Sequence, residues 1–292
     1  MLKRFAVLMT VAVLGTPLLA VGASTAPAGA AITNTLTVQA RDFAYTLDGH
    51  LRPGQAQITF ENQGKEPHIM AIFKLKAGKT LKDVKKALKS NDEKDFGKVA
   101  SDTEGAYGYP FFLTPGGKAT SITDLFTAGN YVMLCFISDA HGHPHFTKGM
   151  LQVFKIAGKP VKPQPVESDG TVVVTDTTIQ TPPSPAPTNV TVKVENQGTT
   201  VHSFIIVKLN GAATPPDVNA FFDKTYKGGP LPANAPGEVL SGVGDIPPGK
   251  SVYLTWKDLP PGRYGYASIS GNSDAPGGDD FAKGLYGEFE IQ

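Results

Sequence analysis

Residues 57–64 read Gln-Ile-Thr-Phe-Glu-Asn-Gln-Gly, and residues 191–198 read Thr-Val-Lys-Val-Glu-Asn-Gln-Gly. Each closing glycine is followed, four positions later, by a histidine, His68 or His202. The two stretches and their histidines are all 134 residues apart. Apolar and polar residues alternate before each Glu-Asn-Gln-Gly, which is the pattern of a β-strand with one buried face. The sequence therefore predicts, twice, a strand that leads through a turn to a histidine.

The duplication continues along the chain in the same order. Pro115-Gly116 matches Pro248-Gly249, and Gly129-Asn130-Tyr131 matches Gly262-Arg263-Tyr264, both at a separation of 133 residues, and Phe146 to Gly149 matches Phe281 to Gly284 at 135. A long internal period of this kind indicates repeated structural units, each large enough for a core of its own. We predict four segments: a signal peptide over 1–30, a first unit over 31–156, a Pro-rich linker over 157–169 and a second unit over 170–292.

Within each unit the pattern is that of short strands separated by turns. Alternation recurs at Leu151–Phe154 and Val252–Trp256, and Pro-Gly pairs mark turns. Residues 80–90 instead place Leu81, Val84 and Leu88 on one helical face, and residues 215–222 repeat this pattern more weakly. The expected fold is all-β: two tandem Greek-key β-sandwiches with short helical insertions.

Composition agrees with this class. The chain has 32 Gly and 24 Pro among 292 residues, above the usual share of about 12% but below that of unstructured low-complexity chains. The formal net charge of +1 provides no basic field for nucleic acid. A single cysteine excludes an internal disulfide framework and a four-cysteine zinc site.

The first thirty residues have the pattern of an export signal. Lys3 and Arg4 precede an apolar run to about Gly22, and Ala28-Gly29-Ala30 offers a cleavage site, with Val21-Gly22-Ala23 as a second one. A membrane anchor is the alternative, but the run is near the lower limit for spanning. We expect a secreted, periplasmic or cell-envelope protein without a membrane span after cleavage. A lone thiol in an oxidising compartment needs protection, which makes Cys135 the residue to explain.

Cys135 lies in a stretch with the residues of a metal centre. A strand is expected to deliver Cys135, a loop follows, and His145 and Met150 come just before the next strand, while the earlier His68 supplies a second imidazole. One thiolate, two imidazoles and one thioether are the ligand set of a blue-copper site. Alternatively Cys135 and Met150 are core residues and His68 is a surface histidine. We predict one type 1 copper per chain, bound by His68, Cys135, His145 and Met150.

These motifs resemble the cupredoxin superfamily, which includes plastocyanin, azurin and the copper nitrite reductases. The resemblance covers nearly all of residues 32–292 and implies His68, Cys135 and His145 as equatorial ligands and Met150 as the axial one. The nine-residue spacer between Cys135 and His145 is similar to that of the nitrite reductases. Two departures stand out: Ile69 replaces a frequent asparagine, and Leu134 and Phe136 flank Cys135 where reductases and laccases place a histidine.

The second unit has lost this ligand set. His202 matches His68, but Ser268 stands in the place of Cys135, Asp280 in that of His145 and Leu285 in that of Met150. A unit without a thiolate cannot hold type 1 copper, so we expect it to be metal-free and His202 to be a relic.

The other histidines are ambiguous. His141 and His143 form an H-x-H-x-H run with His145 that can chelate a second metal, although solvated loop histidines are common. His50 receives no functional interpretation.

We expect an electron carrier that exchanges one electron with redox partner proteins through an exposed edge of His145, beside Pro144 and Phe146. The first alternative is a copper-delivery protein that uses the His-rich loop. Others are a component of a multicopper-oxidase or nitrite-reductase-like system, and a metal-free adhesion sandwich. Too few histidines lie outside the first unit for a self-contained oxidase. The oligomeric state stays open.

Overall fold

The computed structural model describes residues 31–90, 93–101, 107–184, 186–226, 235–270 and 278–292. The predicted signal peptide, residues 1–30, lies outside the described residues. Among the described residues, no helix is long and apolar enough to cross a bilayer.

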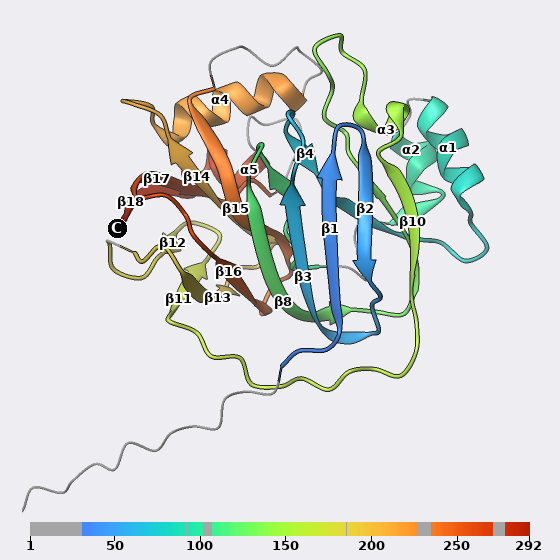
Figure 1. Cartoon of the computed structure of the whole chain (residues 1–292), viewed down its shortest axis with the longest axis horizontal. Coiled ribbons are helices and arrows are strands. Elements are labelled where there is room, and N and C mark those ends of the chain that lie inside the picture. The colour runs from blue at the N-terminus through green and yellow to red at the C-terminus, as the bar shows by residue number, and fades with distance from the viewer. Residues whose placement is uncertain (1–30, 91–92, 102–106, 185, 227–234, 271–277) are drawn as a thin grey trace, which may run out of the picture.

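The first half of the chain forms two four-stranded sets around a common core (Figure 1). One set has the order β2-β1-β3-β8 and the other has the order β10-β9-β5-β6, while β4 pairs with β7. The strands are β1 (Thr35–Arg41), β2 (Ala44–Gly49), β3 (Gly54–Asn62), β4 (His68–Ile69), β5 (Ala71–Leu75), β6 (Ala100–Ser101), β7 (Phe112–Leu113), β8 (Lys118–Phe126), β9 (Gly129–Leu134) and β10 (Leu151–Ile156).

The second half repeats this arrangement. Its two sets have the orders β12-β11-β13-β16 and β15-β14-β17-β18, and β11 runs parallel to β13 as β1 does to β3. The predicted all-β fold and its duplication are confirmed. The strands are β11 (Gly170–Val174), β12 (Ile179–Gln180), β13 (Val190–Asn196), β14 (His202–Leu209), β15 (Gly237–Ile246), β16 (Ser251–Trp256), β17 (Gly262–Ala267) and β18 (Tyr286–Ile291).

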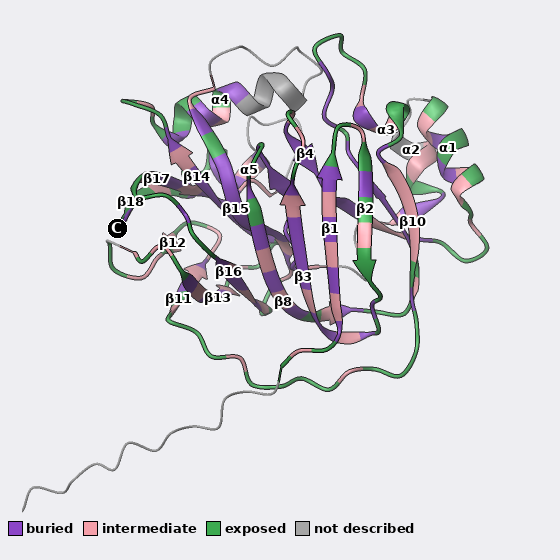
Figure 2. Ribbon diagram, viewed as in Figure 1, coloured by how far each residue is buried: buried purple, intermediate pink, exposed green. Residues whose placement is uncertain are grey.

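Alternation of side chains explains why these segments are strands. In β1 every second residue is buried, and β13 and β16 show the same period, so one face of each strand lines the core and the other does not (Figure 2). Central strands such as β14 are buried on nearly every residue. The apolar pattern read from the sequence therefore sets which face turns inward.

Helices cover parts of the sheets. The helix predicted over 80–90 begins with a capping box, in which the Thr80 N–H donates to Asp83 Oδ2 and the Asp83 N–H to Thr80 Oγ1. Its weaker counterpart extends to Tyr226, beyond the predicted end at residue 222. The helices are α1 (Leu81–Ser90), α2 (Glu93–Gly97), α3 (His145–Lys148), α4 (Pro215–Tyr226) and α5 (Gly278–Ala282). Three short helices, α2, α3 and α5, were not indicated by the sequence.

The two units share a sheet. β8 pairs antiparallel with β16, which joins one four-stranded set from each unit into an eight-stranded sheet (Figure 1). Residues 157–169 also contact the first unit: Val161 bridges to Gly54, and Gln164 exchanges two hydrogen bonds with the side chain of Gln55. Pairing satisfies backbone groups that an open strand edge leaves exposed, so the second unit protects the edge of the first.

Candidate metal centre

The duplicated Glu-Asn-Gln-Gly turn positions the first histidine. The Asn62 side chain donates to the carbonyls of Glu66 and Leu113 and accepts from the Gly64 N–H, which fixes the chain between β3 and β4. Gly64 is required because a Cβ there would lie 2.6 Å from His68 Nε2. The second unit repeats each contact with Asn196 and Gly198. The motif is therefore a scaffold that packs a buried histidine against a glycine.

Cys135 follows the end of β9 and is fully buried. Its backbone N–H donates to the Met150 carbonyl at 3.1 Å, and its Sγ accepts the Ile69 N–H at 3.3 Å. The Tyr45 hydroxyl donates to the carbonyl of the same Ile69. The hydrogen bond to the sulfur comes from the backbone N–H of Ile69. It is therefore present although the side chain at this position is apolar.

His145 opens α3 and completes a cluster with Cys135 and His68. One ligand atom from each of the three residues lies within 4.8 Å of the other two. His68 Nδ1 and His145 Nδ1 are 3.2 Å apart, and Cys135 Sγ is 3.5 Å from His145 Nδ1. All three side chains are buried. The structure therefore brings together three of the four predicted ligands from distant parts of the chain.

The outer nitrogen of each histidine contacts a carboxylate. His68 Nε2 lies 3.2 Å from Asp42 Oδ1, and His145 Nε2 lies 2.8 Å from Glu66 Oε2. Because a carboxylate accepts hydrogen bonds, each Nε2 carries the proton and each Nδ1 presents a lone pair toward the cluster. A carboxylate that orients a histidine in this way is the usual partner of a metal-binding imidazole.

In these tautomers the two Nδ1 atoms, 3.2 Å apart, both present lone pairs, and a cation bound by both would relieve their repulsion. The single thiol proton of Cys135 cannot bond to both nitrogens, so this donor set fits a metal ion. Nitrogen ligands at about 2.0–2.1 Å from one ion lie within about 4 Å of each other, which agrees with the observed separation. Soft sulfur together with imidazole favours copper.

The pKa values agree with this interpretation for the histidines. Burial and the neighbouring His145 lower the pKa of His68 to about 4, although Asp42 opposes the shift. Burial also lowers the pKa of His145 against the effect of Glu66. Both rings are therefore neutral near pH 7, as metal ligands must be. Burial raises the pKa of the Cys135 thiol to about 11, so a bound metal must displace its proton.

Met150, the fourth predicted ligand, is fully buried beside the cluster. Its carbonyl accepts the Cys135 N–H, and its own N–H donates to the His145 carbonyl at 3.1 Å. The backbone thus ties Met150 to both residues. Its role as axial ligand stays a prediction.

His141 and His143 lie outside this cluster. Their side chains are 80% and 66% exposed, and their rings stack with centroids 6.3 Å apart. Asp139 organises the loop: its Oδ1 accepts the N–H groups of both histidines, and its Oδ2 forms an ion pair with Lys148. The sequence had given no role to Asp139.

The prediction that one edge of the His145 ring is exposed to solvent is wrong. Its side chain is fully buried, and Glu66 lies over the nitrogen that was expected to face solvent. The ring of Phe43 also contacts it edge-on, at a centroid distance of 4.8 Å. Pro144 and Phe146 are half-buried and do not frame an exposed imidazole. A carboxylate brought by the loop after β3 thus closes this side.

The second unit shows what replaced the cluster. Ser268 Oγ accepts the Ser203 N–H at 2.9 Å, as Cys135 Sγ accepts that of Ile69, and Asp280 Oδ2 lies 2.6 Å from His202 Nδ1. Asp176 contacts His202 Nε2 at 3.1 Å, as Asp42 contacts His68. Burial lowers the pKa of His202, but the hydrogen bonds and charges of Asp280 and Asp176 outweigh it and the net shift is upward. A buried histidine between two carboxylates, with a raised pKa, occupies the equivalent place.

Several important residues escaped the sequence interpretation: the carboxylates Asp42 and Glu66 and the hydroxyl of Tyr45. One signal was available, because Asp42 and Asp176 are also 134 residues apart and thus belong to the repeat. Glu66 has no such signal, since Thr200 stands in its place.

No protein-family model matches the chain, and a search of curated proteins gives no match. Among solved structures, the chain is similar to reduced auracyanin from the photosynthetic bacterium Roseiflexus castenholzii, with 22% identity over 44% of this chain and 99% of auracyanin, at a TM-score of 0.30. It is similar to a multicopper oxidase, with 14% identity over 88% of each chain and a TM-score of 0.23. It is also similar to the copper-containing nitrite reductase from Thermus scotoductus SA-01, with 12% identity over 88% of this chain and 61% of the reductase, at a TM-score of 0.22.

The fold and the cluster are both seen in the residues of this chain. Its strands repeat one arrangement twice, and the first copy brings two imidazoles and a thiol together, with one ligand atom of each within 4.8 Å of the others. The chain is therefore an all-β protein of two repeated units, the first of which contains a buried His-Cys-His cluster.

Proposed function

We propose that the protein binds one type 1 copper ion in its first unit and carries single electrons between redox partner proteins. The observation that supports this most directly is the buried pair of facing Nδ1 atoms, 3.2 Å apart, beside the Cys135 thiol. His68, Cys135 and His145 would hold the ion, with Met150 as the fourth ligand. When bound, copper supplies a one-electron couple between Cu(I) and Cu(II).

The chain's own residues give this site its properties. Asp42 and Glu66 hold the two imidazoles in one tautomer and orientation, so the donor set is arranged before the metal arrives. The apolar surroundings exclude water from the thiol, which protects it from oxidation. A buried, fixed donor set suits electron transfer better than substrate binding, so we propose a carrier and not a self-contained enzyme.

The burial of His145 directs attention to Phe136, the residue that follows Cys135. Phe136 is 39% exposed, and its ring contacts Phe73 and Phe146 edge-on at centroid distances of 5.9 and 6.0 Å. Phe73, Phe136 and Phe146 form a small aromatic surface. Two of its members are bonded directly to cluster residues, because Phe136 follows Cys135 and Phe146 follows His145. We propose this surface as the place where redox partners approach, in place of the edge of His145.

Replacing the exposed ring tests this approach. Phe136→Ala should slow electron self-exchange between copper-loaded copies by about tenfold, the factor for losing roughly 1.4 kcal/mol of contact in the encounter. Tyr286→Ala is a matched control, since Tyr286 is 38% exposed but lies on β18 of the second unit. Exchange rates are measured by NMR line broadening in mixtures of the two oxidation states. An unchanged exchange rate in the Phe136 variant would show that redox partners approach through another face of the protein.

A copper-delivery protein is the second candidate, because the exposed His141 and His143 form a pair that could receive metal. The ion pair of Asp139 with Lys148, together with the N–H groups that Asp139 accepts, holds this loop in place. We therefore expect that changing both histidines to alanine leaves the optical spectrum and the rate of copper loading nearly unchanged. The measurement is stopped-flow loading from a copper–chelator complex. A loading rate that falls tenfold while the spectrum is preserved would favour delivery.

The metal content should be one copper per chain. The second unit has Ser268, Asp280 and Leu285 where the first has its thiol, imidazole and thioether, and His202 already bonds to two carboxylates. Elemental analysis of the loaded full chain should find one copper, and the spectrum should show a single type 1 centre. Two type 1 coppers per chain would disprove the loss of the second site.

We further propose that the protein acts outside the cytoplasm. The charged start, apolar run and small residues of segment 1–30 support export. Mass determination of the mature protein would test cleavage after Ala30 or Ala23. No feature of the sequence supports binding of nucleic acid, because the net charge is close to zero.

A further inference from the structure

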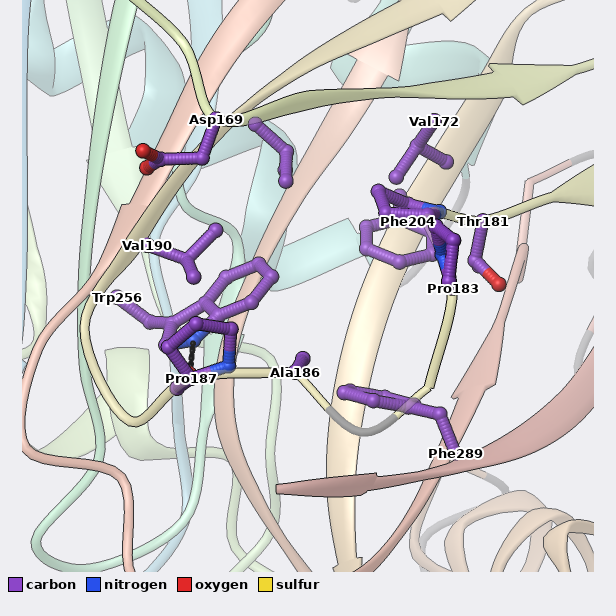
Figure 3. A pocket seen from close by; sticks show the side chains of 12 residues that line it. Asp169, Val172, Thr181, Pro183, Ala186, Pro187, Val190, Phe204, Trp256 and Phe289 are labelled. Atoms are coloured by element: carbon purple, nitrogen blue, oxygen red, sulfur yellow. Dashed lines mark hydrogen bonds between the residues drawn. The ribbon is translucent and has the colours of Figure 1, made fainter. Parts of the chain in front are cut away.

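The second unit contains a pocket that the proposed electron carrier does not use. It is open to solvent and lies at one end of the sandwich between β11, β13 and β16 on one side and β14 and β18 on the other (Figure 3). The linings of small-molecule sites are mostly apolar with a few polar groups. The pocket matches this description.

A shortened strand explains why the pocket exists. In the first unit β2 pairs with β1 over six residues, whereas its counterpart β12 pairs with β11 over only two. Thr181-Pro182-Pro183 follows β12 directly, and prolines cannot donate to a sheet ladder. The chain therefore leaves the sheet edge and crosses the open end of the sandwich. Gly170 permits this path, since a Cβ there would lie 2.9 Å from Pro182 Cγ.

The chain that crosses is described at residues 181–184 and 186–187, and its far end is attached by two hydrogen bonds. The Ala186 N–H donates to the Glu290 carbonyl at 2.7 Å. Trp256 Nε1 donates to the Pro187 carbonyl at 3.2 Å (Figure 3). These bonds hold Ala186 and Pro187 at the rim of the pocket.

Aromatic side chains line the interior. Trp256 and Phe204 are buried, and Phe289 lies half-buried at the opposite side (Figure 3). The first unit has smaller or more flexible residues at the equivalent places, Thr123 for Trp256 and Met70 for Phe204. Two of the three lining rings, Trp256 and Phe204, are therefore found in the second unit alone, while Phe289 has Phe154 as its counterpart.

Asp169 carries the one charge among the lining side chains. It is exposed at the rim, where its Oδ2 accepts the Thr191 N–H at 2.8 Å. A cation at this rim keeps part of its hydration shell and is attracted by the carboxylate of Asp169. The faces of the aromatic rings also attract cations. An anion would be repelled by both. The lining thus combines an apolar interior, aromatic rings and one negative edge.

We propose that this pocket binds a small organic cation with an aromatic or branched hydrocarbon body, such as an arylalkyl ammonium compound. The hydrocarbon part would lie between Trp256, Phe204 and Val192, and the ammonium group would face Asp169. The site is independent of the metal centre and is expected to behave alike in metal-free and metal-loaded protein.

The chain provides its own reporter, because Trp256 is the only tryptophan. We would titrate the full chain with benzyltrimethylammonium, with the neutral benzyl alcohol and with the anionic phenylacetate, following Trp256 fluorescence and confirming each titration by calorimetry. A saturable change with the cation is expected at a dissociation constant of about 1 mM or tighter, and at least tenfold weaker binding of the other two compounds.

Two variants locate the site. Asp169→Asn should weaken binding of the cation about three- to fivefold, the size of a partly exposed ion pair. Ala186→Phe should fill the mouth of the pocket and abolish the saturable change. Asp48→Asn, which makes the same charge change on exposed β2 of the first unit, is the control and should bind as the natural chain does.

Three results would overturn the proposal. They are the absence of a saturable signal up to about 10 mM of the cation, equal binding of benzyl alcohol or phenylacetate, and unchanged binding by both pocket variants. None of them bears on copper binding, which is measured by its own spectrum.

Discussion

The Cys135→Ser protein should lose the intense red-light absorption of the copper-loaded protein completely. That absorption arises from charge transfer between a thiolate and Cu(II), and Cys135 is the only cysteine of the chain. A serine oxygen is a hard ligand, so the site loses the soft donor that distinguishes it from an ordinary two-histidine site. The backbone hydrogen bond of residue 135 to the Met150 carbonyl does not involve the side chain, and the serine Oγ can accept the Ile69 N–H that Cys135 Sγ accepts.

The matched control lies at the equivalent position of the second unit. Ser268→Ala removes a hydroxyl that contacts Asp280 and Ser203 but should leave the spectrum unchanged. The measurement is the optical spectrum of both variants after loading with Cu(II), together with elemental analysis. A Cys135→Ser protein that remained blue would refute the ligand assignment. Loss of colour in the Ser268 variant would refute the claim that only the first unit holds copper.

The His202→Ala protein should be destabilised by about 3–5 kcal/mol, the usual cost of leaving a buried charge without its partner. Asp280 is buried at 1% exposure and lies 2.6 Å from His202 Nδ1. Removal of the imidazole leaves this carboxylate with the Ser268 hydroxyl, at 2.5 Å, and no counter-charge. Urea unfolding followed by the fluorescence of Trp256 measures the second unit selectively, since the only tryptophan lies there.

A second substitution separates lost charge pairing from lost packing. His202→Ala with Asp280→Asn should be less destabilised than His202→Ala alone, because the amide carries no charge. His50→Ala, an exposed histidine of the first unit, should change the free energy of unfolding by less than about 0.5 kcal/mol. A His202→Ala protein as stable as the natural chain would show that no buried ion pair exists there.

The same pair predicts a pH dependence. The net pKa of His202 is raised above its ordinary value of 6.5, so its contribution to stability is complete below about pH 6.5 and is lost as the pH rises through the folded-state pKa. The free energy of unfolding should therefore fall as the pH rises above about 6.5, by at most about 1.4 kcal/mol per pH unit for one proton. His202→Ala should lack this slope. A slope that persists in the variant would come from another group.

The sequence alone was sufficient for the duplication and for the replacement of Cys135, His145 and Met150 by Ser268, Asp280 and Leu285 in the second unit. Repeated spacing survives in the sequence because each unit needs the same strand, turn and histidine at the same places. The contacts agree pair by pair: Ser268 accepts an N–H as Cys135 does, and Asp280 meets His202 as His145 meets His68. The strands and α1 were predictable too, because their side-chain periods and caps are local.

What surrounds the site was decided only by the tertiary structure. Asp42 lies 26 residues from His68, and Glu66 lies 79 residues from His145, so no local pattern connects either carboxylate with its imidazole. The pairing of β8 with β16 and the aromatic pocket at Trp256 likewise depend on which loops and edges meet after folding. The burial of His145 is the clearest case. Its residue type and spacing indicated a ligand, but whether its outer edge faces solvent depends on a glutamate delivered by another loop, and only packing of distant segments sets that contact.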